Sequence, residues 1–181
     1  MLCGIDEAGR GPIAGDLVMA GCILHSRVEG LNDSKKLTEK KREALFELII
    51  KASSYHIVKF SPQAIDANGI SKCLASGLRE IMQNLACDEY LFDGNTTFGV
   101  DGLSTMVKAD GKVAEVSAAS ILAKVTHDRD ILKEALKYPQ YQFEKHKGYG
   151  TKLHIEMIKK HGYCKIHRRT YKLKALEATL F

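Results

Sequence analysis

The sequence predicts an α/β fold in which a sheet is flanked by helices. Short apolar runs of strand length alternate with longer segments whose apolar residues recur at helical spacing. Two of the strand-length runs end directly in carboxylates, one at Asp6 and Glu7 and the other at Asp93. Because open α/β sheets bind ligands at loops along one edge, we expect these acids to mark the functional edge.

The composition is that of one ordinary globular domain. The 181 residues are 45% hydrophobic with only three prolines, which is enough to bury a core. No apolar run reaches membrane-spanning length and no basic segment precedes an apolar stretch, so we expect neither a membrane span nor a secretory signal. Five scattered cysteines without Cys-x-x-Cys spacing disfavour a disulfide framework and a zinc site. We expect a cytoplasmic protein and, without a heptad pattern, a monomer.

The first predicted strand delivers two adjacent carboxylates into a turn. Residues 2–5 are mostly apolar, and glycines with a proline follow at residues 9–12. A buried carboxylate is normally paired, hydrogen-bonded or bound to a metal. Asp6 and Glu7 are therefore candidate metal ligands. The alternative is an ordinary strand, turn and strand with a solvated acidic pair.

The turn itself has the composition of a ligand-binding loop. Gly9 and Gly11 lack Cβ atoms, so their main chain can approach a ligand closely, while Arg10 places a cation beside it. This arrangement suits a phosphate or a sugar.

The next elements build the sheet and cover it. Residues 17–24 predict a second strand, antiparallel to the first because the connecting loop is short. Thr38 is a predicted N-cap of an amphipathic helix that extends to about Ser53. Residues 55–60 predict a third strand and residues 64–68 a short helical turn.

The middle of the chain repeats the alternation. Residues 70–85 predict an amphipathic helix, residues 90–92 a short strand that runs into Asp93, and residues 105–108 a weaker strand. Asp110 and Gly111 are predicted to form a turn.

The longest predicted helix covers residues 114–138 and ends at Pro139. A polar stripe follows one of its faces at steps of three, four and four residues: Ser117, Ser120, Lys124 and Asp128. The stripe could aim Asp128 toward the carboxylates at the strand ends. The alternative is that Asp128 is a surface residue near Arg129.

The C-terminal quarter is basic. Residues 141–181 contain 10 of the 27 lysines and arginines but only 3 of the 22 acids. This asymmetry favours a nucleic-acid partner, although a solvated lysine-rich helix would give the same count. Thr151 is a predicted N-cap of a helix through Lys160. Tyr149, between two glycines, would expose its ring for stacking on a sugar or base, or would pack on its own domain.

Six segments in order resemble the ribonuclease HII family along nearly the whole chain: Gly4–Pro12, Asp33–Leu37, Phe92–Asn95, Ala118–Asp128, His146–Thr151 and His167–Tyr171. The resemblance implies a ribonuclease H-like mixed sheet flanked by helices, with a small helical C-terminal portion. Residues 1–140 would be the catalytic core, and residues 141–181 a basic helical portion packed on the same domain. It also implies an endonuclease that cleaves the RNA strand of RNA–DNA hybrids and ribonucleotides embedded in duplex DNA, leaving 3′-hydroxyl and 5′-phosphate ends.

The resemblance also implies the site residues. By motif position, the four carboxylates are Asp6, Glu7, Asp93 and Asp128. The tripeptide that contacts the ribonucleotide is Gly9, Arg10 and Gly11, and the tyrosine that packs on the sugar is Tyr149. Two Mg²⁺ or Mn²⁺ ions suit hydrolysis of a phosphodiester, and hard cations take carboxylate ligands. We expect Asp6 to bridge the two ions.

Three positions depart from the family pattern. Gly15 and Asp16 stand where a second Gly-Pro is usual, Ala109 replaces a common glycine before Asp110, and His127 stands where arginine is more frequent. None of these departures removes a carboxylate of the expected set.

Partner contacts are predicted from charge and from the chain end. The candidate contacts to the nucleic-acid backbone are Lys35, Lys36, Lys124, Arg168, Arg169 and Lys172. Residues 177–181 resemble the Leu-Phe-ending peptides by which replication enzymes dock on a sliding clamp. The alternative is that Leu180 and Phe181 pack into the domain.

Two other functions compete with this interpretation. A non-catalytic binder of hybrids or DNA would gain nothing from clustered acids facing phosphate without a metal, so the acids argue against it. A ribonuclease HIII is the alternative among enzymes, but the chain lacks the additional N-terminal domain that we expect of one.

Overall fold

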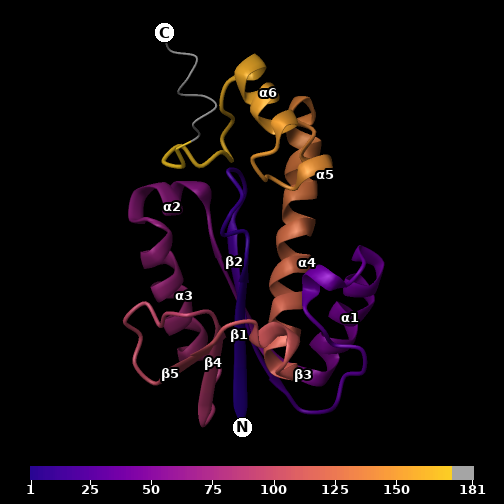
Figure 1. The fold of residues 1–181 in the computed structure, drawn as a ribbon, viewed down its shortest axis with the longest axis vertical. Helices are drawn as coiled ribbons and strands as arrows, with labels where there is room; N and C mark the ends of the chain where they lie inside the picture. Colours follow the sequence, from indigo (N-terminus) through magenta and orange to yellow (C-terminus); the bar gives the residue numbers. More distant parts are fainter. Residues whose placement is uncertain (173–181) are drawn as a thin grey trace.

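The computed structural model describes residues 1–172 and contains a five-stranded sheet covered by helices (Figure 1). The strands are β1 (Leu2–Ala8), β2 (Leu17–Leu24), β3 (Ser53–Phe60), β4 (Glu89–Asp93) and β5 (Leu103–Met106), in the order β3-β2-β1-β4-β5. The pairs β1–β2 and β2–β3 are antiparallel, whereas β1–β4 and β4–β5 are parallel. The predicted mixed sheet is confirmed.

The helices are α1 (Glu39–Ala52), α2 (Pro62–Asn68), α3 (Ile70–Asn84), α4 (Ala114–Lys137), α5 (Phe143–His146) and α6 (Lys152–His161), with short 3₁₀ turns at η1 (Ser34–Lys36), η2 (Ala109–Gly111) and η3 (Pro139–Tyr141). Two predicted N-caps are confirmed. The Thr38 hydroxyl accepts from Lys41 N–H, and the Thr151 hydroxyl accepts from His154 N–H. The last strand begins two residues earlier than predicted, because its pairing with β4 starts at Leu103.

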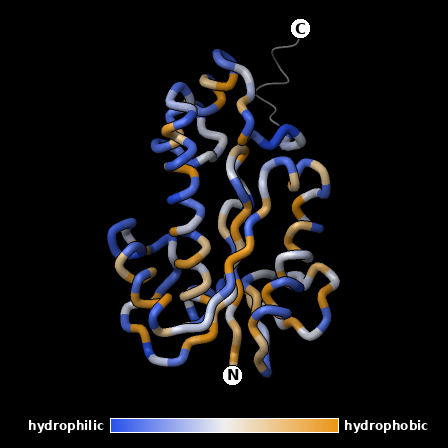
Figure 2. Tube along the Cα trace, turned by 180° about the vertical axis from the view of Figure 1, so that it is seen from behind, coloured by the Kyte–Doolittle hydropathy of each residue, from blue (hydrophilic) through white to orange (hydrophobic). Residues whose placement is uncertain are grey.

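Strand β2 is buried on both faces, so it is a continuous apolar run rather than an alternating one. Leu17 and Met19 pack into the core under α3, while Val18 and Ala20 pack into the core under α1 and α4. In Figure 1, α2 and α3 lie on one side of the strands and α1 and α4 on the other. Figure 2 shows the orange, hydrophobic colour concentrated along the central strands.

Gly4 lets α4 lie directly on β1. A Cβ atom at this position would overlap the main chain of Glu115 and Val116 at the start of the helix. The close approach brings the first turns of α4 next to the carboxyl end of β1, where the acids lie.

A third core cluster joins the C-terminal portion to the rest of the chain. Ile13 and Ala14, from the β1–β2 loop, pack with Ile131 of α4, Phe143 of α5 and Ile158 of α6. The small helices therefore sit at the far end of α4, above the β1–β2 turn (Figure 1). Within residues 1–172, none of the helices combines the length and the apolarity needed to cross a bilayer.

Candidate active site

Parallel pairing of β1 with β4 brings the first two acids together. Ile5 is the register partner of Phe92, so Asp6 and Asp93 leave neighbouring strands side by side at the same edge. A third acid, Asp110, comes from η2 after β5. One carboxylate oxygen from each of the three lies within 4.8 Å of the others. The main-chain N–H of Asp110 also donates to Asp93 Oδ2 at 3.3 Å.

The electrostatics of this cluster favour a cation. Burial, followed by the charge of Glu7, raises the pKa of Asp6 well above its usual value. Burial, together with the neighbouring carboxylates of Asp93 and Asp33, raises the pKa of Asp110 to about 6. Ionised carboxylates this close repel one another, and a divalent ion would remove that repulsion.

The donor set fits Mg²⁺ or Mn²⁺. All the donors are carboxylate oxygens, which hard cations prefer. Burial also raises the pKa of Glu7, even though the Arg10 guanidinium lies 3.7 Å from Glu7 Oε1. Within the described residues, the other oxygen, Glu7 Oε2, is buried and has no hydrogen-bond partner. A buried carboxylate oxygen that lacks a donor is a natural cation ligand.

Asp128 does not belong to this cluster, and the expectation for it is corrected. Its carboxylate accepts from Lys124 Nζ at 2.8 Å and lies 3.1 Å from His127 Nδ1 and 3.9 Å from Arg42 Nη2. Burial would raise its pKa, but the hydrogen bonds from His127 and Lys124 hold the pKa below the usual value. Asp128 is therefore an ionised partner of nearby cations.

Distance along α4 explains the correction. Ser120 and Lys124 are the residues of the polar stripe that line the same groove as Asp6, and Ser120 bonds Ser34 Oγ at 2.8 Å. Asp128 follows eight residues later, which is about 12 Å further along a helix. Asp128 therefore shares a helix face with Ser120 but lies too far along the helix to join the acids.

Asp110 is the site residue that sequence reasoning missed. The signal was available, because Asp110 follows β5, and β5 runs parallel to β4, so its carboxyl end lies at the same edge as Asp93. The Asp110-Gly111 pair was instead predicted only as a turn, with no functional role. The 3₁₀ turn η2 turns Asp110 back toward the strand ends.

The Gly9-Arg10-Gly11 loop is held from behind by a buried arginine. Arg168 is 1% exposed. Its guanidinium donates to the carbonyls of Gly9 at 2.6 Å, Arg10 at 3.3 Å and Gly15 at 2.8 and 3.0 Å. The expectation that Arg168 contacts nucleic acid is therefore corrected, because its donors are already used by the main chain of the loop. Gly9 adopts a φ of +84°, which glycine accepts without strain.

A groove runs beside the acids and contains most of the other predicted contacts. Its lining residues are Asp6, Glu7, Ala8, Gly9, Arg10, Gly11, Ser34, Lys35, Ser120, Lys124 and Tyr149. An adjoining pocket adds Lys36 and Lys108 beside Asp93 and Asp110. Arg169 and Lys172 are exposed and line neither pocket. The loop, the tyrosine and three of the lysines thus gather around the acids.

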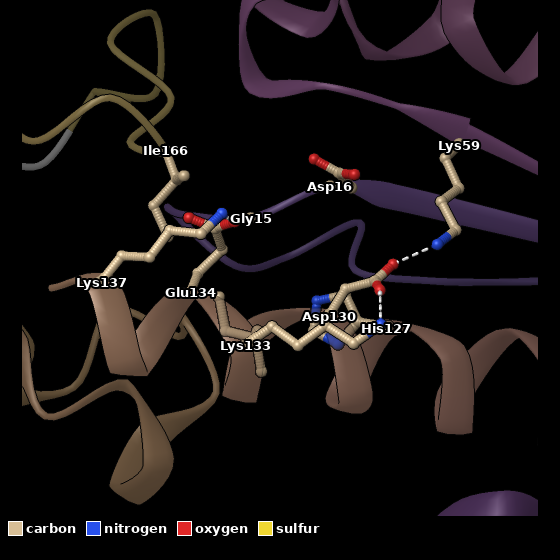
Figure 3. Close-up of a pocket in the computed structure, with 10 residues that line it drawn as sticks. Gly15, Asp16, Lys59, His127, Asp130, Lys133, Glu134, Lys137 and Ile166 are labelled. Atoms are coloured by element: carbon tan, nitrogen blue, oxygen red, sulfur yellow. Dashed lines mark hydrogen bonds and ion pairs between the residues drawn. The ribbon is translucent and has the colours of Figure 1, made fainter.

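Another pocket lies on the other side of the β1–β2 loop and is separate from this site (Figure 3). It is lined by Gly15, Asp16 and Ile166 together with side chains of α4, and none of the clustered acids lines it. Lys59 and Lys133 both pair with Asp130 there, so much of its charge is already matched.

Comparison with known proteins points in one direction. Residues 3–174 match the family model described as Ribonuclease HII. A curated ribonuclease HII of Sulfurovum sp. (strain NBC37-1) is 63% identical over 181 residues, which cover 99% of this chain and 96% of that one. The chain is also similar to two solved structures, each 30% identical. The PCNA:RNase HII complex from Archaeoglobus fulgidus has a TM-score of 0.83 with 96% of both chains covered. The ribonuclease H2 from Pyrococcus horikoshii OT3 has a TM-score of 0.79, with 98% of this chain and 95% of that one covered.

Proposed function

The chain belongs to the ribonuclease HII family and is a hydrolytic endonuclease that degrades RNA in RNA–DNA hybrids, and we propose that Asp6, Glu7, Asp93 and Asp110 form its catalytic centre. The observation that carries this proposal is the convergence of the carboxylates of Asp6, Asp93 and Asp110 within 4.8 Å, beside the glycine loop. Asp6 meets Asp93 and Asp110 there at one edge of the sheet, although both lie more than 80 residues further along the chain.

The family depends on divalent metal, and the acidic cluster fits one. Asp6, Asp93 and Asp110, with the unpartnered oxygen of Glu7, would hold Mg²⁺ or Mn²⁺. We propose a two-ion site, in which Asp6 would be the ligand that both ions share. Bound metal would supply an acidified water and neutralise charge on the phosphate during hydrolysis.

The protein groups around the cluster have distinct parts in the reaction. Water adds to the phosphorus, the bond to the 3′-oxygen breaks, and the products carry a 3′-hydroxyl and a 5′-phosphate. Lys35, Lys36 and Lys124 line the site as cations that can bind the substrate backbone. Lys124 does so while paired with Asp128, which keeps its ammonium group in place.

Selection of RNA depends on the 2′-hydroxyl, which both donates and accepts hydrogen bonds. We propose that the main chain of Gly9, Arg10 and Gly11 binds this hydroxyl and that the Tyr149 ring packs on the sugar. The ring is 44% exposed and lies 3.6 Å from the position that a Cβ atom of Gly11 would take. A ribonucleotide embedded in duplex DNA offers the same sugar, so it should also be a substrate.

A cleavage assay tests this function. We expect the purified protein to cut a DNA duplex that carries one ribonucleotide on addition of Mg²⁺ or Mn²⁺, with no cut in an all-DNA duplex. Asp6→Asn should abolish turnover and leave hybrid binding intact. A protein that binds hybrid but does not cleave it with either metal would be a non-catalytic binder, and the proposal would be wrong.

We also propose a protein partner and a cellular location. One similar solved structure is a PCNA:RNase HII complex. We propose that residues 177–181 of this chain dock on a sliding clamp; these residues, including Leu180 and Phe181, lie outside the described part of the structure. Deleting Leu180 and Phe181 should abolish clamp binding in a surface-immobilised clamp assay, and unchanged binding would refute the idea. We further propose that the protein acts as a monomer in the cytoplasm, and gel filtration would test the oligomeric state.

A further inference from the structure

Three buried histidines form a cluster behind Tyr149. His146 ends α5, His154 lies in the first turn of α6, and His167 follows α6. The rings of His146 and His154 are stacked with centroids 4.2 Å apart, and the His154 and His167 rings are 5.1 Å apart. All three are buried and none lines the groove, so the catalytic cluster does not account for them.

The hydrogen bonds of this cluster define the tautomer of each ring. The main-chain N–H of Cys164 donates to His167 Nδ1 at 2.8 Å, so the His167 proton lies on Nε2. His154 Nδ1 lies 2.9 Å from the carbonyl of Tyr149, which only accepts, so the His154 proton lies on Nδ1. The two Nε2 atoms are 3.0 Å apart. His167 is therefore the donor and His154 the acceptor, and both ends of the chain of bonds require this direction.

His146 holds Gly148, the residue before Tyr149, in the same way. Its Nε2 lies 2.9 Å from the carbonyl of Tyr141 and must be the donor, while its Nδ1 accepts from the N–H of Gly148 at 3.3 Å. All six ring nitrogens of the cluster thus have partners when the three rings are neutral. The N–H of Gly148 and the carbonyl of Tyr149 are both held by histidines, so the dipeptide that presents the Tyr149 ring is fixed on both sides.

We propose that His154 and His167 are positioning residues: they form a one-way hydrogen-bond relay, from the main chain of Cys164 to the carbonyl of Tyr149, that sets the tyrosine ring against the glycine loop. This inference rests on the proposed role of Tyr149 at the ribose. The relay touches no reacting atom. Its effect is to fix the backbone that carries the ring, and so the fit of a ribonucleotide.

The surroundings keep the relay neutral. Burial lowers the pKa of His154 and of His167 to about 4, and it lowers the pKa of His146 as well. The charged side chains that act on the cluster are Glu144, which favours a charge on His146, and Arg169, which opposes one on His167. The phenol rings of Tyr141 and Tyr163 pack against His167, and the exposed His161 packs against Tyr141 rather than against the cluster. A proton added to His154 would place two N–H groups face to face across 3.0 Å, and one added to His167 would face the N–H of Cys164 across 2.8 Å.

A spectroscopic experiment tests the relay independently of catalysis. The full-length protein labelled with ¹⁵N-histidine should show, at pH 7, a His154 ring protonated on Nδ1 and His146 and His167 rings protonated on Nε2. Single substitutions assign the signals. A His154 ring protonated on Nε2, or one that is charged or averaged between tautomers, would overturn the inference whatever the activity of the enzyme.

Kinetics then test the effect on Tyr149. His154→Phe keeps a planar ring but removes the hydrogen bonds to His167 and to the Tyr149 carbonyl. We expect its KM for a single-ribonucleotide duplex to rise about 5- to 10-fold with little change in kcat, which is the effect of the one buried hydrogen bond lost at the Tyr149 carbonyl. His154→Asn places an amide N–H near the position of Nδ1 and should recover much of this loss. His161→Phe, an exposed histidine on the same helix, is the matched control and should behave as wild type. Equal KM values for His154→Phe and wild type would refute the relay.

A double-mutant cycle separates failure of the relay from failure of the proposed function. In a Tyr149→Ala background there is no ring to position, so His154→Phe should raise KM no further. An undiminished effect of His154→Phe in that background would show that His154 acts elsewhere and would overturn the relay. If Tyr149→Ala by itself changed neither KM nor kcat, the proposed role of Tyr149 would be wrong. The relay would then have no effect on substrate binding, even if the histidine rings had the predicted tautomers.

Discussion

Asp110→Asn is the substitution that most directly tests the acidic cluster, and its effect on stability can be worked out from the structure. Burial, with the charges of Asp93 and Asp33, raises the pKa of Asp110 from 3.8 to about 6. A raised folded-state pKa means that the ionised form destabilises the fold above that pH, by about 1 to 3 kcal/mol at pH 7.5. Asparagine removes this cost, so the metal-free variant should unfold roughly 3 to 10 °C higher than wild type. Below about pH 3 the Asp110 carboxyl is protonated in both the folded and the unfolded state, so the gain should vanish.

The same substitution should lose the reaction. Removing one ligand of a catalytic cation costs several kcal/mol of transition-state stabilisation, which corresponds to a loss of about 10²- to 10⁴-fold in kcat/KM. The assays are cleavage of a single-ribonucleotide duplex and thermal unfolding with and without Mg²⁺ or Mn²⁺. We expect the metal to stabilise wild type and to stabilise Asp110→Asn much less.

Asp128→Asn is the matched control, because it removes an equally buried carboxylate from the same part of the chain. Asp128 has a lowered pKa and pairs with Lys124 and Arg42, so its loss should destabilise the protein by about 1 to 3 kcal/mol at neutral pH. The stabilisation by metal should remain. The reasoning is refuted if Asp128→Asn abolishes the metal-induced rise in melting temperature while Asp110→Asn keeps it.

Three further predictions follow from buried groups. His154 and His167 have folded-state pKa values of about 4, below the unfolded value of 6.5, so the neutral rings should keep the fold at full stability above pH 6.5. As the pH falls toward 4, the free energy of unfolding should drop by up to about 3 kcal/mol for each histidine. Urea unfolding at pH 7 and 4.5 measures this drop, and equal stabilities at the two pH values would contradict it. Arg168→Met should leave the carbonyls of the glycine loop without donors and lower both stability and kcat/KM, as read from unfolding and cleavage; unchanged cleavage would mean that the loop does not need the guanidinium. Gly4→Ala should cost about 2 kcal/mol or more, because the added methyl group overlaps the main chain at Glu115, and a melting temperature equal to that of wild type would exclude this close approach.

Local patterns predicted most of the elements correctly. The apolar run of β2, the stripe of α3 and the N-caps Thr38 and Thr151 are confirmed, because each depends on residues that are neighbours in the sequence. The 3₁₀ turn after Asp33 was not predicted. Its single turn is held by the Asp33 side chain, which accepts from Lys35 N–H, and so short an element has no periodicity to detect.

The residues of the site also differ in whether local sequence or long-range packing places them. The sequence by itself determined that Asp6 and Glu7 end a buried strand, that glycines follow them, and that Asp93 ends another strand, since strand ends and turns are local properties. Only the tertiary structure decided that Asp110 joins them, that Asp128 pairs with cations on α1 and α4, and that Arg168 supports the loop from within. These placements depend on the parallel register of β1, β4 and β5 and on how far along α4 the acids lie, and both are set by packing between segments that are distant in the chain.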